Sequence, residues 1–205
     1  MAEEVNHLDA LIVQAELAIV NGDIPQLIVL YERMAQLGVR KTSALIGELY
    51  EAGFVSGPHK FEKNLDEAIR WYRQSVFESD DPGAHLGLGR IYYEGSPTIK
   101  KDLLKAQAHL QKAYEKNLPQ AGIYLGAMSM FGIGVEKNLA DAERFFLKAA
   151  GGEFPLAYRY LANIAAGSGK FFRTFEMLVK EFILSSKLRI QDRNHPNLWK
   201  LPEEN

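Results

Sequence analysis

Few residues in this sequence have the type and spacing that chemistry at a protein site requires. The sequence contains no cysteine, which excludes disulfides, thiolate metal sites and cysteine nucleophiles. No two histidines are spaced i, i+4, the spacing that would place two metal ligands on one face of a helix. The five are His7, His59, His85, His109 and His195. His85 and His109 share one repeat and are the pair most able to approach each other, but we expect no metal site.

The segment Gly167-Ser168-Gly169-Lys170 is similar to the end of a phosphate-binding loop. That motif needs a glycine where Ile164 stands and a serine or threonine where Phe171 stands. It also needs a preceding strand, whereas the residues before Gly167 have the pattern of a helix. We therefore expect a turn between two helices here, with no bound nucleotide and no other cofactor.

The carboxylates do not form a catalytic set with a nucleophile and a base. They stand next to basic residues along predicted helices, as in Glu143-Arg144 and Asp66-Glu67 before Arg70. Neighbouring opposite charges of this kind are typical of a solvated helix face. We expect the protein not to be an enzyme, with no catalytic residues.

The composition favours a soluble globular protein. Hydrophobic residues make up 47% of the 205 residues, and the net charge of -2 gives no basic field that would attract nucleic acid or anionic lipid. The first residues, Met-Ala-Glu-Glu, lack the basic region of a signal peptide. Asp9, Gln14 and Glu16 interrupt the apolar run that follows. We expect a cytoplasmic monomer that binds neither nucleic acid nor membrane.

Three stretches of the sequence align with one another, and this repetition predicts the fold. In residues 46–54, 88–96 and 125–133, a glycine stands second and another follows six residues later. Apolar residues spaced i, i+4 and i+7 predict a first helix in each copy. A second helix is predicted to follow in each copy, and its equivalent alanines are Ala68, Ala106 and Ala142. The first glycines of successive copies are 42 and 37 residues apart. A repeat of this length is typical of solenoids built from helix pairs.

The first glycine of each copy has a predicted packing role. A glycine inside a helix costs about 1 kcal/mol, so its recurrence at one position suggests that helices approach closely there. We expect Gly89 and Gly126 to be such packing glycines. The residue pairs that begin at Trp71, His109 and Phe145 are predicted to fill the groove between neighbouring helix pairs.

The predicted domain is a single solenoid spanning residues 1–205. Its repeats occupy residues 42–83, 84–120 and 121–156, between capping helix pairs at 1–41 and 157–187. Residues 54–63 form an inserted loop that lengthens the first repeat. The tail at 188–205, which contains Pro196, Trp199 and Pro202, is predicted to be irregular.

The repeated pattern resembles a known family. It combines Leu-Gly-x-x-Tyr-x-x-Gly with Asp/Asn-Leu-x-x-Ala-x-x-Trp/Phe-Tyr/Phe-x-x-Ala-Ala, and it is similar to the Sel-one-like repeat, a relative of the tetratricopeptide repeat. The third copy matches best, at Leu125-Gly126, Phe131-Gly132, Asn138, Ala142 and Phe145-Phe146. The resemblance covers residues 42–156. It implies an all-α, right-handed α-α superhelix of about five helix pairs that recruits protein partners and has no catalysis of its own.

Tetratricopeptide-type packing also implies that the first helices line a concave surface. Eight residues near this surface, outside the predicted core stripe, are the candidate partner-binding set: Glu48, Glu51, Arg90, Tyr93, Tyr124, Met130, Arg159 and Asn163. Their mixture of acid, base, aromatic and thioether side chains suits a protein or peptide ligand. The leading hypothesis is an adaptor that grips a partner protein in this groove. The alternatives are an immunity protein that neutralises a cognate toxin and, from a different class, a regulatory subunit of an enzyme or a cryptic enzyme.

Overall fold

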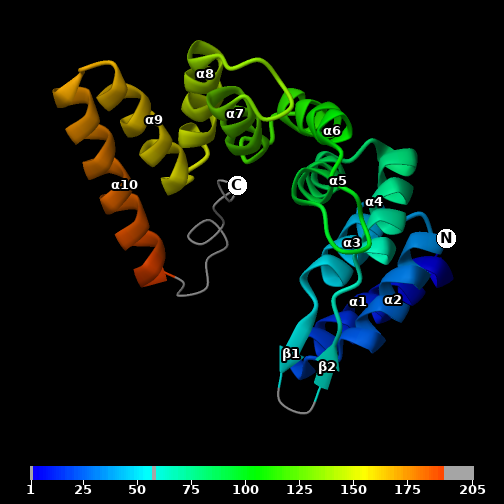
Figure 1. The fold of residues 1–205 in the computed structure, drawn as a ribbon. Coiled ribbons are helices and arrows are strands. Elements are labelled where there is room, and N and C mark those ends of the chain that lie inside the picture. The colour runs from blue at the N-terminus through cyan, green and yellow to red at the C-terminus, as the bar shows by residue number, and fades with distance from the viewer. Residues whose placement is uncertain (1, 57–58, 192–205) are drawn as a thin grey trace. The chain divides into compact units, whose positions relative to one another are not determined.

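The computed structural model describes residues 2–56 and 59–191, and it describes side chains for 7–54 and 61–188. Within these ranges the chain folds almost entirely into helices (Figure 1). They are α1 (Ala2–Asn21), α2 (Ile24–Gln36), α3 (Thr42–Ala52), α4 (Leu65–Ser79), α5 (Pro82–Glu94), α6 (Leu103–Glu115), α7 (Ala121–Phe131), α8 (Leu139–Gly151), α9 (Pro155–Gly167) and α10 (Phe171–Gln191). Four consecutive pairs pack against each other: α1 with α2, α3 with α4, α7 with α8, and α9 with α10.

Short polar residues set the beginning of the second helices where the sequence predicts them. The side-chain oxygens of Asn64, Asp102 and Asn138 accept hydrogen bonds from backbone N–H groups in the first turns of α4, α6 and α8. Each bond satisfies one of the amide donors that a helix leaves unpaired at its N-terminus. Each of these polar residues directly precedes its helix, so α4, α6 and α8 begin at Leu65, Leu103 and Leu139.

The inserted segment after α3 differs from the expected loop, because it contains a short β-hairpin. Strands β1 (Phe54–Ser56) and β2 (His59–Phe61) pair antiparallel, with Phe54 opposite Phe61. The ring of Phe61 lies 5.1 Å from the ring of Tyr50 on α3 and packs against the core beneath. Strands of three residues carry too little alternation to be predicted from the sequence.

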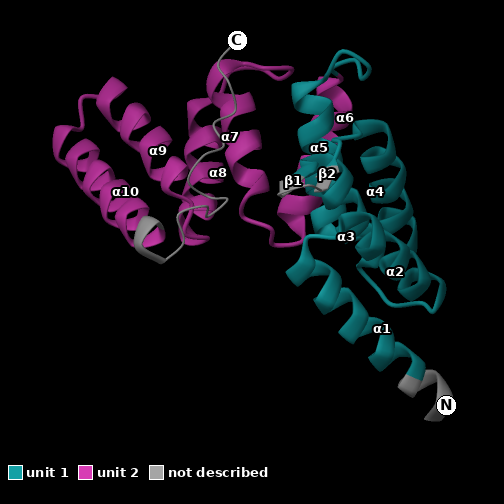
Figure 2. Cartoon of the chain, turned by 90° about the horizontal axis from the view of Figure 1, so that it is seen from below, with its two compact units in different colours: residues 1–101 teal, residues 102–205 magenta. Residues whose placement is uncertain are grey.

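The structure divides into two compact units, residues 1–101 and 102–205 (Figure 2). In unit 1, Tyr72 of α4 is fully buried between two helices that each present a glycine to its ring. A Cβ atom on Gly47 of α3 would lie 2.7 Å from the ring, and one on Gly87 of α5 would lie 2.4 Å from it. Glycine at these positions therefore lets α3 and α5 approach the tyrosine directly.

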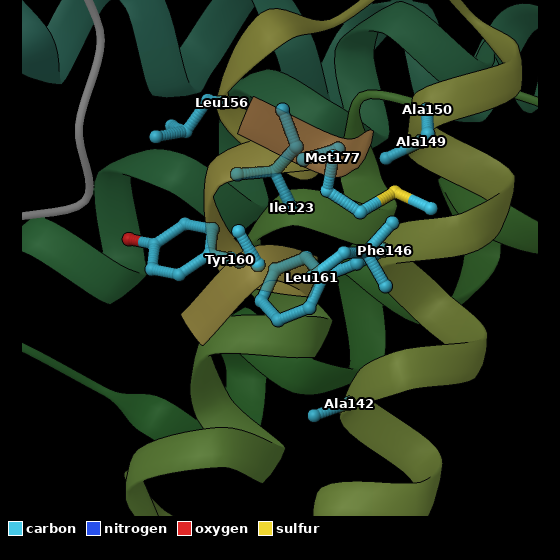
Figure 3. Close-up of a cluster of buried hydrophobic side chains, with 11 residues drawn as sticks. Ile123, Ala142, Phe146, Ala149, Ala150, Leu156, Tyr160, Leu161 and Met177 are labelled. Atoms are coloured by element: carbon cyan, nitrogen blue, oxygen red, sulfur yellow. The ribbon is translucent and has the colours of Figure 1, made fainter. Parts of the chain in front are cut away.

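In unit 2 a glycine likewise faces a fully buried aromatic ring, that of Phe146 on α8. A Cβ atom on Gly126 of α7 would lie 2.5 Å from its ring, and the ring of Tyr160 on α9 stacks on it at 4.6 Å. Met177 of α10 and Leu161 of α9 belong to the same cluster (Figure 3). The predicted packing role of Gly126 is confirmed. Gly89 is buried in α5, and its packing role stays a prediction.

The last helix pair also follows the sequence prediction. Gly167 ends α9, and Lys170 immediately precedes α10. The phosphate-loop-like segment is thus the expected turn between helices. Helix α10 runs to Gln191, beyond the predicted helix end at Lys187, while residues 192–205, with Trp199, lie outside the described residues. The predicted all-α class of paired helices is confirmed.

Candidate functional site

The first helices of the repeats are buried on most of their surface. On α5, every residue from Ala84 to Tyr93 except Arg90 is buried, and on α7 every residue from Ala121 to Ser129 is buried. The cause is their position, because α3 and α4 both pack on α5, while α6 and α8 both pack on α7. Little of these two helices is left to face a partner.

For three of the eight predicted binding residues, this burial corrects the expectation that they lie outside the core. Glu51, Tyr93 and Tyr124 are buried, with 8%, 4% and 4% of their surface exposed. Arg90 and Met130 are partly buried. The remaining three are exposed: Glu48, Arg159 and Asn163.

Within unit 1 the structure brings three polar residues together in an ion-pair network. The guanidinium of Arg90 donates two hydrogen bonds to the carboxylate of Glu51, at 2.6 Å from Nε and 2.5 Å from a terminal nitrogen. The hydroxyl of Tyr72 donates to the same carboxylate at 2.7 Å. This bidentate geometry ties α3, α4 and α5 to one another.

The network has a structural role in the core and not a catalytic one. Burial, the negative charge of Glu51 and the hydrogen bond to it together raise the pKa of the Tyr72 hydroxyl far above its usual range. A tyrosine that stays protonated and a carboxylate neutralised by arginine offer neither a nucleophile nor a free base. We infer that Glu51 and Arg90 stabilise the packing of helices in unit 1.

Glu48 is the exposed member of the predicted set in unit 1. It lies one turn before Glu51 on α3. Partial loss of hydration raises the pKa of its carboxyl above the usual range, opposed by Arg90 and reinforced by Glu51 and Asp81. Glu48 therefore gives this part of α3 an accessible acidic group.

In unit 2 the exposed members of the predicted set lie on α9. Arg159 keeps half of its side chain exposed and pairs with Glu181 of α10 at 2.8 Å. Asn163 lies one turn further along α9 and is also exposed. Met130 at the end of α7 packs partly against the core of this unit. These residues offer a mixed polar and apolar surface.

Sequence reasoning missed an open pocket of about 530 Å³ in unit 1. It lies where the beginning of α4 meets the end of α5, and its charged lining comes from Glu51, Lys63, Asp66 and Glu94. These residues come from separate segments, so no local motif signals the pocket. In the part of the chain that the structure describes, no group of three or more histidine or acidic residues has the arrangement of a metal site.

Two further features bear on the sequence-based expectations. His85 is buried and hydrogen-bonded to Asp80 at 2.8 Å, which gives it a place in the fold of unit 1.

Among the helices of the described residues, none has the length and apolar character needed to cross a bilayer.

Comparison with known proteins finds relatives that are named as a regulator of chitin synthase and as a component of a ubiquitin-protein ligase. The chain is 29% identical over 139 residues to chitin synthase regulator SKT5 of Saccharomyces cerevisiae, covering 67% of this chain and 19% of that protein. It is 29% identical over 140 residues to the ERAD-associated E3 ubiquitin-protein ligase component HRD3B of Arabidopsis thaliana, covering 64% and 23%. The chain thus spans about a fifth of the length of these relatives.

Solved structures share the fold of this chain, and a family match identifies its repeat. A Sel1 repeat protein from Oxalobacter formigenes superposes with a TM-score of 0.70 at 20% identity, over 87% of this chain and 75% of that one. The protective antigen c5321 of uropathogenic Escherichia coli, which displays an SLR fold, gives 0.68 at 21% identity, over 93% and 43%. The Sel1 repeat itself matches residues 44–76, 82–118 and 119–151, half of the sequence. The chain therefore belongs to the Sel1 repeat family.

Proposed function

We propose that this protein is a non-catalytic adaptor that binds a partner protein through the exposed residues of its first helices. The observation that carries the proposal is the array of three Sel1 repeats, an architecture shared with a chitin synthase regulator and a ubiquitin-ligase component. Helical repeats present extended surfaces, which suits the binding of protein segments.

The contact residues we propose are those of the predicted set that remain accessible. In unit 2 they are Arg159 and Asn163, with Met130 as an adaptable apolar neighbour. Arginine is among the residues enriched in the centres of protein interfaces. In unit 1 the contact residue is Glu48, whose carboxylate would meet a basic or hydrogen-bond-donating group. The buried members, Glu51, Tyr93 and Tyr124, act by holding the helices in place.

A second candidate is the regulatory subunit of an enzyme. It is favoured by the names of the relatives, one a regulator of chitin synthase and one a component of a ubiquitin ligase. In this version the partner is itself an enzyme, and binding changes its activity. No observation on this chain favours a toxin as the partner.

Affinity purification with quantitative mass spectrometry tests the proposal. Arg159→Glu should remove a specific protein that the wild type enriches. Arg144→Glu is the matched control, because Arg144 is also exposed and also pairs with one acidic residue, Asp141. Equal loss with Arg159→Glu and Arg144→Glu would count against the proposal.

A further inference from the structure

Helix α10 is apolar on two opposite faces. One face packs inward, where Met177 and Leu188 are buried. The other face presents four phenylalanines to solvent: Phe171 at 78%, Phe172 at 93%, Phe175 at 70% and Phe182 at 70% exposure. A helix that caps a repeat array needs a polar outer face for solubility. The expectation that residues 157–187 form a cap is therefore not matched by the outer face of α10.

The exposed area is large enough for a stable protein interface. At roughly 150–250 Å² per aromatic ring, the four phenylalanines offer on the order of 600 Å² of apolar surface. Leu178, Val179 and Ile183 lie on the same side of α10 and are also exposed. They bring the apolar face to roughly 800 Å², the area that each partner contributes to an interface of standard size.

The charges beside this face specify an orientation. Glu176 and Lys180 lie one turn apart along one flank of the apolar face and form an ion pair with each other. If a second α10 packed parallel to the first, this flank would face the opposite flank of the second helix, and Glu176 and Lys180 would not meet their counterparts. If it packed antiparallel, Glu176 of each copy would face Lys180 of the other. The apolar face and its flank are thus self-complementary in the antiparallel arrangement.

We propose that the outer face of α10 binds the same face of a second copy of this chain, forming a two-fold symmetric dimer. Antiparallel packing centred between Leu178 and Val179 places Phe175 of one copy against Phe182 of the other. Each contact occurs twice, as in any two-fold interface. This dimer does not depend on the proposed adaptor function, and it replaces the sequence-based expectation of a monomer.

Sedimentation equilibrium of the full chain, from about 1 µM to about 100 µM, tests the dimer across the affinity range expected of such an interface. The wild type should have twice the mass of one chain at the upper end. The double variant Phe175→Glu with Phe182→Glu should be monomeric throughout. Phe77→Glu, which alters a phenylalanine of α4 that is 87% exposed, is the matched control and should dimerise like the wild type. Helicity measured by circular dichroism should be the same in all three chains.

A charge exchange tests the antiparallel register separately. Glu176→Lys alone should weaken the dimer at least tenfold, because a lysine at position 176 of each copy then faces Lys180 of the other. Adding Lys180→Glu should restore wild-type dimerisation. A wild type that stays monomeric over the whole range would overturn the proposal and favour residues 192–205 as the cover of this face. A dimer that survives Phe175→Glu with Phe182→Glu would overturn it as well.

Discussion

Glu51 and Arg90 illustrate what a single sequence can and cannot reveal about individual residues. Both fall outside the apolar stripe of their helices, and on an isolated amphipathic helix that position would be exposed. In this fold the first helices are contacted from several sides, so a charged residue off the stripe can still be buried. The partners stand 39 positions apart in the sequence, on different helices, and no local pattern links them. The tertiary packing, which the sequence does not display, decides their role.

Removing the carboxylate of Glu51 should destabilise unit 1 strongly. Glu51→Ala removes the carboxylate that accepts two hydrogen bonds from the largely buried guanidinium of Arg90 and one from the hydroxyl of Tyr72. Loss of one partner of a buried ion pair costs about 3–5 kcal/mol. Urea unfolding followed by circular dichroism measures this change.

The matched control is Glu67→Ala, which removes one partner of an exposed ion pair with Arg70. Exposed pairs contribute only about 0–1 kcal/mol, so this variant should stay near the wild type. Equal midpoints for the two variants would show that the Glu51 network does not stabilise the fold.

Tyr72 should make stability fall at alkaline pH. Its pKa in the folded chain is raised far above the ordinary value of 10.0, so above that pH the unfolded chain releases a proton that the folded chain keeps. Its contribution is therefore complete below pH 10.0 and is lost as the pH rises, by up to about 1.4 kcal/mol per pH unit. Tyr72→Phe should reduce the slope of unfolding free energy against pH in this range. Identical slopes in the two proteins would contradict this assignment.

At the scale of elements, the recurring glycines and aromatic residues made the fold predictable. Each of the three repeats has the same pattern, with a glycine on the first helix and a large side chain on the second. Tyr72 and Phe146 occupy equivalent places, and glycines of the first helices approach both. Because this combination of a glycine and a large side chain lies within one repeat and recurs, aligning the copies with one another detects it. The β-hairpin occurs once and has short strands, and it could not be found in this way.

Adding one methyl group at Gly126 should disturb this packing. In Gly126→Ala the new Cβ would lie 2.5 Å from the ring of Phe146, which is fully buried and stacked on Tyr160. The ring or the helix must shift to make room, and overpacking of this kind costs about 1–3 kcal/mol. The melting temperature and the urea midpoint should both fall.

Gly151→Ala is the control for this prediction. Gly151 also lies in a helix of unit 2, but a Cβ there meets nothing within 4 Å. The change should be neutral or stabilise by up to about 1 kcal/mol, because alanine is the better helix former. If Gly126→Ala behaved like Gly151→Ala, the close approach of α7 to Phe146 would be refuted.

At the scale of the whole molecule, the repeat array explains why a fold could be assigned while most of the binding site could not. Three similar repeats with apolar helix faces require a packed array of helices, whichever partner the protein binds. Recognition depends on the few side chains that this packing leaves exposed, and exposure is a property of the assembled helices. Of the eight predicted contact residues, the fold leaves Glu48, Arg159 and Asn163 exposed.

The most direct test of the adaptor function is the affinity of the purified chain for the partner recovered by affinity purification. Titration calorimetry should compare the wild type with Arg159→Glu and with its control Arg144→Glu. Loss of an interface arginine costs about 2 kcal/mol or more, so Arg159→Glu should raise the Kd at least tenfold. Arg144→Glu should leave the Kd within about twofold of the wild type. Equal affinity of all three proteins, or a loss confined to Arg144→Glu, would contradict partner binding through the first helices.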